Sequence, residues 1–145
     1  MNFDISQIAS AANLPADESN TPLNMPKAIV GALGAALAVG LVYGVVGRFV
    51  AEFSYLAVLI GSASGLAAVR LGGKATPVVG AISAVASLVM VLAAKLIVGS
   101  PEGSSWLSYH LTLFDIMFCY LANPIAAFVA GGTGVGRGLL SRLPF

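Results

Sequence analysis

The sequence predicts an all-α integral membrane protein, an antiparallel up-and-down bundle of four transmembrane helices. Four apolar stretches, at about residues 27–50, 54–70, 77–98 and 111–131, fill most of the chain, and nearly all charged residues lie at their ends. A helix that crosses a hydrocarbon core about 30 Å thick needs about 20 apolar residues. The composition agrees, because 58% of the residues are hydrophobic and only 9% are charged, whereas a typical soluble domain is about 25% charged.

The composition also excludes several classes of function. A net charge of +1 implies neither a nucleic acid nor an acidic substrate as partner. The single cysteine, Cys119, excludes an intramolecular disulfide and a multi-cysteine metal site. We expect this thiol to be a small buried hydrophobic group rather than a nucleophile.

Residues 1–25 differ from the rest of the chain, because they are polar and carry three acidic residues. They lack a basic start followed by an apolar run, so they do not form a cleavable signal peptide. We predict a flexible N-terminal tail, with a docking peptide built on Phe3, Ile5 and Ile8 as the alternative. The transmembrane domain is then residues 26–138, and residues 139–145 form a short C-terminal tail.

The distribution of lysine and arginine predicts the orientation. With four passes, both termini and the middle connection lie on the same side of the membrane, which collects five of the seven basic residues. Because positive flanks resist translocation, both termini are predicted to be cytoplasmic, in a cell membrane protein. The five residues are Lys27, Arg70, Lys74, Arg137 and Arg142, and the other side has Arg48 and Lys95.

The connections predict how the helices begin and end. Residues 48–53 leave room only for a tight hairpin, in which Arg48 and Glu52, four residues apart, are placed to pair. The third helix begins at Thr76-Pro77, a capping residue followed by proline at the first helical position. The longest connection, 99–110, ends in an interfacial lead-in that carries Trp and Tyr.

Small residues predict close helix packing. Gly40 and Gly44 are four residues apart in the first helix, and Gly61 and Gly65 have the same spacing in the second. This spacing lets helix backbones approach closely, either within one chain or between copies. Because four short helices make a thin bundle, we expect a homo-oligomer or a larger membrane complex, with the lipid bilayer as the other partner.

Two ionisable residues stand out, because burying a charge in hydrocarbon costs roughly 3 kcal/mol or more. Lys95 lies near the end of the third helix and Asp115 near the start of the fourth, so both are expected near the same outer face. The sequence predicts an ion pair between them that joins the two helices. The alternative adds His110 to them, as part of a protonation or ion-entry site.

The fourth helix contains Asn123-Pro124 near the bilayer centre. Pro124 removes one backbone donor and frees the carbonyl of Tyr120, so a kink is predicted there. We expect Asn123 to hydrogen bond across helices or to the freed backbone. The alternative is a broken helix that exposes its backbone to a substrate, as in some channels and carriers.

The remaining patterns predict no catalytic, metal-binding or nucleotide-binding site. The glycine-rich segment 131–138 follows a membrane helix, and no Lys-Ser/Thr pair closes it, so we interpret it as a flexible exit and not as a phosphate loop. His110 is the only histidine, and no serine occupies a nucleophile elbow. We therefore expect no enzymatic activity, no cofactor and no metal.

The stretch 55–70, with its Gly61–Gly65 step, and the stretch 113–118 together resemble a group of uncharacterised bacterial four-helix membrane proteins. In that group a helix with a Gly-x-x-x-Gly step ends in a basic residue, here Arg70, and an aspartate, here Asp115, opens the last helix. The resemblance implies the four-helix topology and nothing more, because no activity is attached to the group. The Asn-Pro pair and the glycine-rich end depart from it.

Together these patterns predict a small non-enzymatic accessory or scaffold subunit that packs with itself or with a larger membrane complex. The alternative is an oligomeric pore or small-solute transporter.

Overall fold

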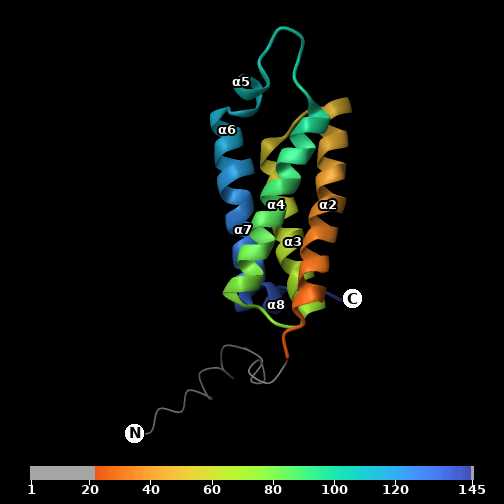
Figure 1. Cartoon of the computed structure of the whole chain (residues 1–145), viewed down its shortest axis with the longest axis vertical. Coiled ribbons are helices and arrows are strands. Elements are labelled where there is room, and N and C mark those ends of the chain that lie inside the picture. The colour runs from red at the N-terminus through yellow and green to blue at the C-terminus, as the bar shows by residue number, and fades with distance from the viewer. Residues whose placement is uncertain (1–21, 145) are drawn as a thin grey trace, which may run out of the picture.

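The computed structural model of the protein describes residues 22–144, so the predicted N-terminal tail lies almost entirely outside the described residues. All regular secondary structure in the described residues is helical, and they contain no strand. Four of its helical segments are long and apolar enough to cross a membrane. They stand side by side in one bundle, in which α2 packs against α3 and α4, and α7 packs against the same two helices (Figure 1).

Helices α2 and α3 form the first hairpin. Helix α2, Met25–Phe49, is capped by Asn24, whose side chain accepts a hydrogen bond from the Lys27 N–H at 3.1 Å. After a short linker, the 3-10 turn Ser54–Leu56 leads into α3, Ala57–Gly72. The residue after this helix, Gly73, caps its end with a φ of 80°, a left-handed conformation that glycine adopts without strain.

Helix α4, Pro77–Val98, begins and ends at the residues that the sequence predicts. The Thr76 hydroxyl accepts a hydrogen bond from the Val79 N–H at 3.2 Å, and Pro77 occupies the first turn. The chain then turns at the end of the bundle opposite to the described termini and returns through the short helix α5, Trp106–His110 (Figure 1). The lead-in that the sequence predicts is therefore helical.

The fourth span is built from three segments: α6, Leu113–Asp115, a π-helical turn, Ile116–Ala122, and α7, Asn123–Gly132. The sequence predicts a kink at Pro124, and the structure places the π-helical turn directly before it. Pro124 has no N–H to donate, and the N–H of Asn123 reaches back five residues to the Phe118 carbonyl. The wider turn thus accommodates the proline without breaking the span.

The glycine-rich end is not a flexible exit, which corrects the sequence-based interpretation. It forms helix α8, Gly134–Leu140, capped by Thr133, whose hydroxyl accepts a hydrogen bond from the Val135 N–H at 3.4 Å. A Cβ on Gly136 would lie 2.0 Å from the Ala130 carbonyl oxygen. The absence of a side chain at Gly136 therefore allows α8 to pack against the end of α7.

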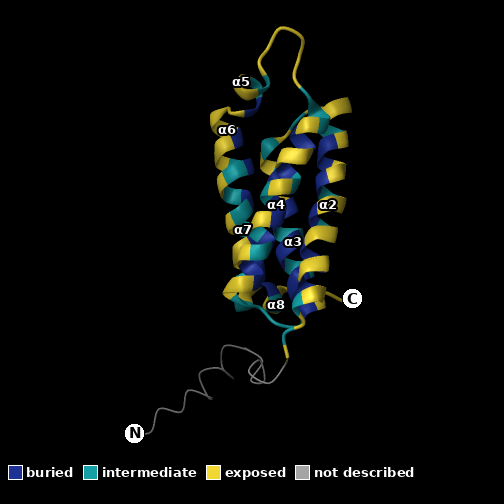
Figure 2. Ribbon diagram, in the orientation of Figure 1, coloured by how far each residue is buried: buried dark blue, intermediate teal, exposed yellow. Residues whose placement is uncertain are grey.

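The bundle has small side chains inside and large apolar side chains outside. Alanine, glycine and serine dominate the buried positions, whereas Val30, Leu96 and Leu113 are 65%, 69% and 70% exposed. Exposed residues follow the outer faces of α2, α4 and the fourth span along their length, whereas α3 has exposed residues only near its two ends (Figure 2). Large side chains therefore cover the outer surface of the bundle, and small ones let its helices approach.

The four glycines that the sequence singles out all face neighbouring helices of the same chain. A Cβ on Gly61 or Gly65 would lie 2.0 Å from the Asn123 carbonyl oxygen or 2.5 Å from the Ala127 carbonyl oxygen, on α7. Gly40 and Gly44 face α4 in the same way, with nearest atoms at 3.4 and 3.1 Å. Of the two alternatives that the spacing allows, the structure shows packing within one chain.

Candidate functional site

A buried polar cluster, which consists of Glu52, Lys95, His110 and Asp115, lies at the end of the bundle opposite to the described termini. The Lys95 Nζ donates to Asp115 Oδ1 at 2.7 Å and to Glu52 Oε1, and it lies 3.4 Å from His110 Nδ1. Lys95 and His110 are fully buried, and Asp115 is 3% exposed. The structure thus brings together the three residues that the sequence singles out.

Glu52 belongs to this cluster, although the sequence predicts that it pairs with Arg48. The Arg48 guanidinium instead donates to the carbonyl oxygens of Ile97 and Val98, at 3.1 and 3.4 Å, at the end of α4. Glu52 lies in the linker between α2 and α3, and it also accepts a hydrogen bond from the Tyr43 hydroxyl at 3.1 Å. The linker turns the carboxylate inward, where the buried Lys95 attracts it more strongly than an exposed guanidinium would.

Asp115 is held by hydroxyl groups from two segments. The Ser54 hydroxyl donates to Oδ1 at 2.7 Å, and the Thr112 hydroxyl donates to Oδ2 at 2.6 Å. Thr112 also accepts from the Asp115 N–H at 3.2 Å, so it caps α6. Each carboxylate oxygen therefore has a donor, as a charged group needs when it is withdrawn from water.

His110 is oriented by the carbonyl of Gly99, which lies 2.8 Å from its Nε2. Because a carbonyl only accepts, Nε2 carries a proton, and Nδ1 faces Lys95 and the Oε2 of Glu52, the latter at 3.5 Å. The cluster thus joins one lysine, two carboxylates and one imidazole.

The sequence gives weak signals for the other members of this network. Glu52 is the only acidic residue between Glu18 and Glu102, which marks it as unusual in an apolar region. Its pairing with Lys95 depends on how α2, α3 and α4 pack, and local spacing does not encode that. Tyr43, Ser54 and Thr112 carry no signal, because a lone hydroxyl is common in membrane helices.

Cys119 is buried beside the cluster, as a small side chain in the fourth span. Its Sγ lies 3.7 Å from the Tyr43 hydroxyl oxygen and 3.7 Å from Asp115 Oδ1. Within residues 22–144, no group of three or more His, Cys, Asp and Glu side chains is placed to hold a metal ion. The chemistry that the arrangement offers is charge pairing and proton exchange.

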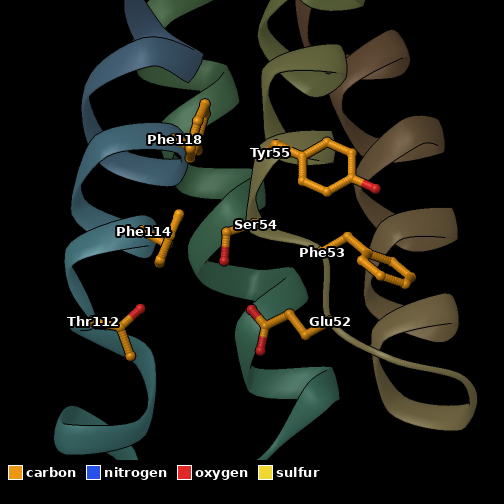
Figure 3. A pocket seen from close by; sticks show the side chains of 7 residues that line it. All are labelled: Glu52, Phe53, Ser54, Tyr55, Thr112, Phe114 and Phe118. Carbon is orange, nitrogen blue, oxygen red and sulfur yellow. The ribbon is translucent and has the colours of Figure 1, made fainter.

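A pocket of about 550 Å³ opens beside the cluster, between the start of α3 and the start of the fourth span (Figure 3). Glu52, Ser54 and Thr112 belong both to the pocket wall and to the hydrogen-bond network of the cluster. The rest of the wall is aromatic, and it consists of Phe53, Tyr55, Phe114 and Phe118.

Asn123 lies apart from the cluster, in the middle of the bundle. Its side chain is fully buried, and neither Oδ1 nor Nδ2 has a hydrogen-bond partner. The expectation that Asn123 bonds across helices or to the freed backbone is therefore wrong. A Cβ on Gly61 would lie 2.7 Å from Oδ1 of Asn123, so this amide packs directly against the backbone of α3.

Comparison with protein-family models, with curated proteins and with solved structures found no match to this chain.

Proposed function

We propose that this protein is a small non-enzymatic integral membrane protein whose four long helices each cross the bilayer. The observation that carries this proposal is the outer surface of the bundle, where large exposed apolar side chains follow α2, α4 and the fourth span along their length. Soluble monomers rarely expose contiguous apolar patches larger than a few hundred Å². A lipid environment accepts this surface, and it requires the close packing of small residues that the interior shows.

The polar cluster supports a role as an accessory or scaffold subunit. It joins the linker before α3, the end of α4 and the segment that leads into α6, so it fixes the loops at one end of the bundle relative to one another. Between this cluster and Arg70 near the opposite end, the described parts of α2, α3, α4 and α7 carry no charged residue. A proton relay through the bundle would need further titratable groups there.

An oligomeric pore or small-solute transporter is the second candidate. The observation that favours it is the pocket beside the cluster, which places the Glu52 carboxylate in its wall. A buried charge network beside an opening is also how membrane carriers bind their solutes.

The predicted topology can be tested by cysteine labelling in a Cys119→Ala background. The variants are Lys74→Cys, in the turn before α4, and Ser104→Cys, in the loop after α4. We expect an impermeant maleimide to label the Ser104→Cys variant in intact cells, and the Lys74→Cys variant only after permeabilisation. The reverse pattern would place the termini outside, and labelling of both variants in intact cells would contradict the four-span topology.

The accessory role can be tested by native mass spectrometry of the protein extracted gently from its own host membrane. We expect larger, unrelated membrane subunits to accompany it, and we expect Asp115→Asn to lower this assembly or the abundance of the protein. Glu102→Gln is the matched control, because this carboxylate is exposed in the loop after α4. A homo-oligomer in which Asp115→Asn keeps assembly but loses solute flux would favour the transporter, and an isolated monomer would contradict both candidates.

A further inference from the structure

The pocket beside the polar cluster has aromatic side chains on two sides. Phe114 and Phe118 stack on one side, with ring centroids 6.5 Å apart and planes at 8°. Phe53 and Tyr55 lie on the other side, with centroids 5.8 Å apart. Figure 3 shows the two pairs on different segments, with Ser54 between them. The volume of about 550 Å³ leaves room for a small headgroup and for the start of the chain that carries it.

The charges around this pocket favour a cation. Glu52 is the only charged residue in its wall, and its side chain is 10% exposed. Lys95 is fully buried behind Glu52, so its ammonium group does not reach the pocket. The charge that the wall itself presents to the pocket is therefore negative.

The hydrogen-bonding groups and the aromatic side chains of the wall indicate which chemical class of ligand the pocket can bind. The hydroxyl protons of Ser54 and Thr112 are already donated to Asp115. Glu52 Oε1 accepts from Lys95 and from Tyr43. Ser54 and Thr112 thus offer no proton to a ligand, which disfavours an anion, and four of the seven residues of the wall are aromatic. Aromatic faces beside a carboxylate instead attract a cation that donates no hydrogen bond, as a quaternary ammonium does.

We propose that this pocket binds a methylated ammonium group, with Glu52 supplying the charge and Tyr55 and Phe114 supplying aromatic faces. In the proposed topology, on which this step rests, the pocket lies at the end of the spans, at the depth of the lipid headgroups. The ligand is therefore either the choline headgroup of a lipid or a free methylated ammonium solute. This binding role is separate from the accessory role, and it stands whether or not the protein joins a larger complex.

Binding can be measured with radiolabelled choline on the full-length protein in nanodiscs of phosphatidylglycerol. The competitor 3,3-dimethyl-1-butanol replaces the trimethylammonium group by a tert-butyl group of the same shape without charge. We expect saturable choline binding, and we expect the neutral alcohol to compete at least tenfold more weakly than unlabelled choline. Absence of saturable binding, or equal competition by the alcohol, would overturn the proposal.

The two sources of the ligand are distinguished by repeating the measurement in nanodiscs of phosphatidylcholine. If a lipid headgroup occupies the pocket, choline binding falls in these nanodiscs, and if the ligand is a free solute, binding is unchanged. Either result is compatible with a methylated ammonium site and identifies its source.

The site itself is tested by variants of the aromatic wall, which leave the polar cluster intact. Tyr55→Leu and Phe114→Leu keep an apolar side chain but remove an aromatic face, and each is expected to weaken choline binding about threefold or more. Phe128→Leu, at a partly exposed position of α7 outside the pocket, is the matched control with unchanged binding. Unchanged affinity in both wall variants would overturn the assignment to this pocket.

Discussion

Lys95→Met is expected to lower the free energy of unfolding by about 3–5 kcal/mol, the cost of leaving buried charges without their partner. The Lys95 ammonium group is fully buried and bonds to both Glu52 and Asp115. Without it, two carboxylates would remain withdrawn from water, with only hydroxyl groups and His110 beside them. A folded chain would then have to protonate or expose at least one of them.

Thermal unfolding of the purified protein in detergent measures this effect, with Lys27→Met as the control for loss of an exposed lysine. The triple variant Glu52→Gln, Lys95→Met and Asp115→Asn is expected to recover much of the lost stability, because the same positions then hold only neutral groups. If Lys95→Met melts at the wild-type temperature, the cluster does not fix the loops at this end of the bundle.

Gly61→Ala is expected to destabilise the protein by about 3 kcal/mol, at the upper end of the cost of overpacking a core. The added Cβ would lie 2.0 Å from the carbonyl oxygen of Asn123 and 2.7 Å from its side-chain oxygen. The nearest atom belongs to the backbone, so no side-chain rotation relieves the clash. Helices α3 and α7 would have to move apart, and the packing along both would loosen.

Gly34→Ala is the matched control, because no atom lies within 4 Å of the Cβ that it adds. Alanine is the better helix former by about 1 kcal/mol, so this variant is expected to melt at or above the wild-type temperature. The amount of folded protein in the membrane and its Tm in detergent give the comparison. Equal stability of the two alanine variants would contradict the close approach of α3 and α7.

The lengths of the apolar stretches and the residues that typically begin and end helices were enough to predict the helical spans. The α4 segment begins and ends as predicted, because Thr76-Pro77 and Gly99 act locally on the backbone. The fourth span was less predictable. The π-helical turn before Pro124 depends on which carbonyl the Asn123 N–H reaches, and several hydrogen-bond patterns satisfy the same residues.

The candidate site was predictable in part. Lys95 and Asp115 were found because a charge in an apolar span is costly, and their positions place them at the same end of the bundle. The position of Glu52 in the cluster was not predictable, because its spacing of four residues from Arg48 indicated a different partner. Loop residues follow the helices that they connect, so their neighbours are decided by packing.

Hydrophobicity and local backbone chemistry are enough to predict the helical class, the four apolar spans and the ionisable residues within or beside those spans. Which of these groups meet depends on the packing of the folded chain. It placed Glu52 against Lys95, left the Asn123 amide without a partner and assembled an aromatic pocket from segments about 60 residues apart. Contacts between distant segments depend on how whole helices pack, and small side chains at many positions allow more than one arrangement.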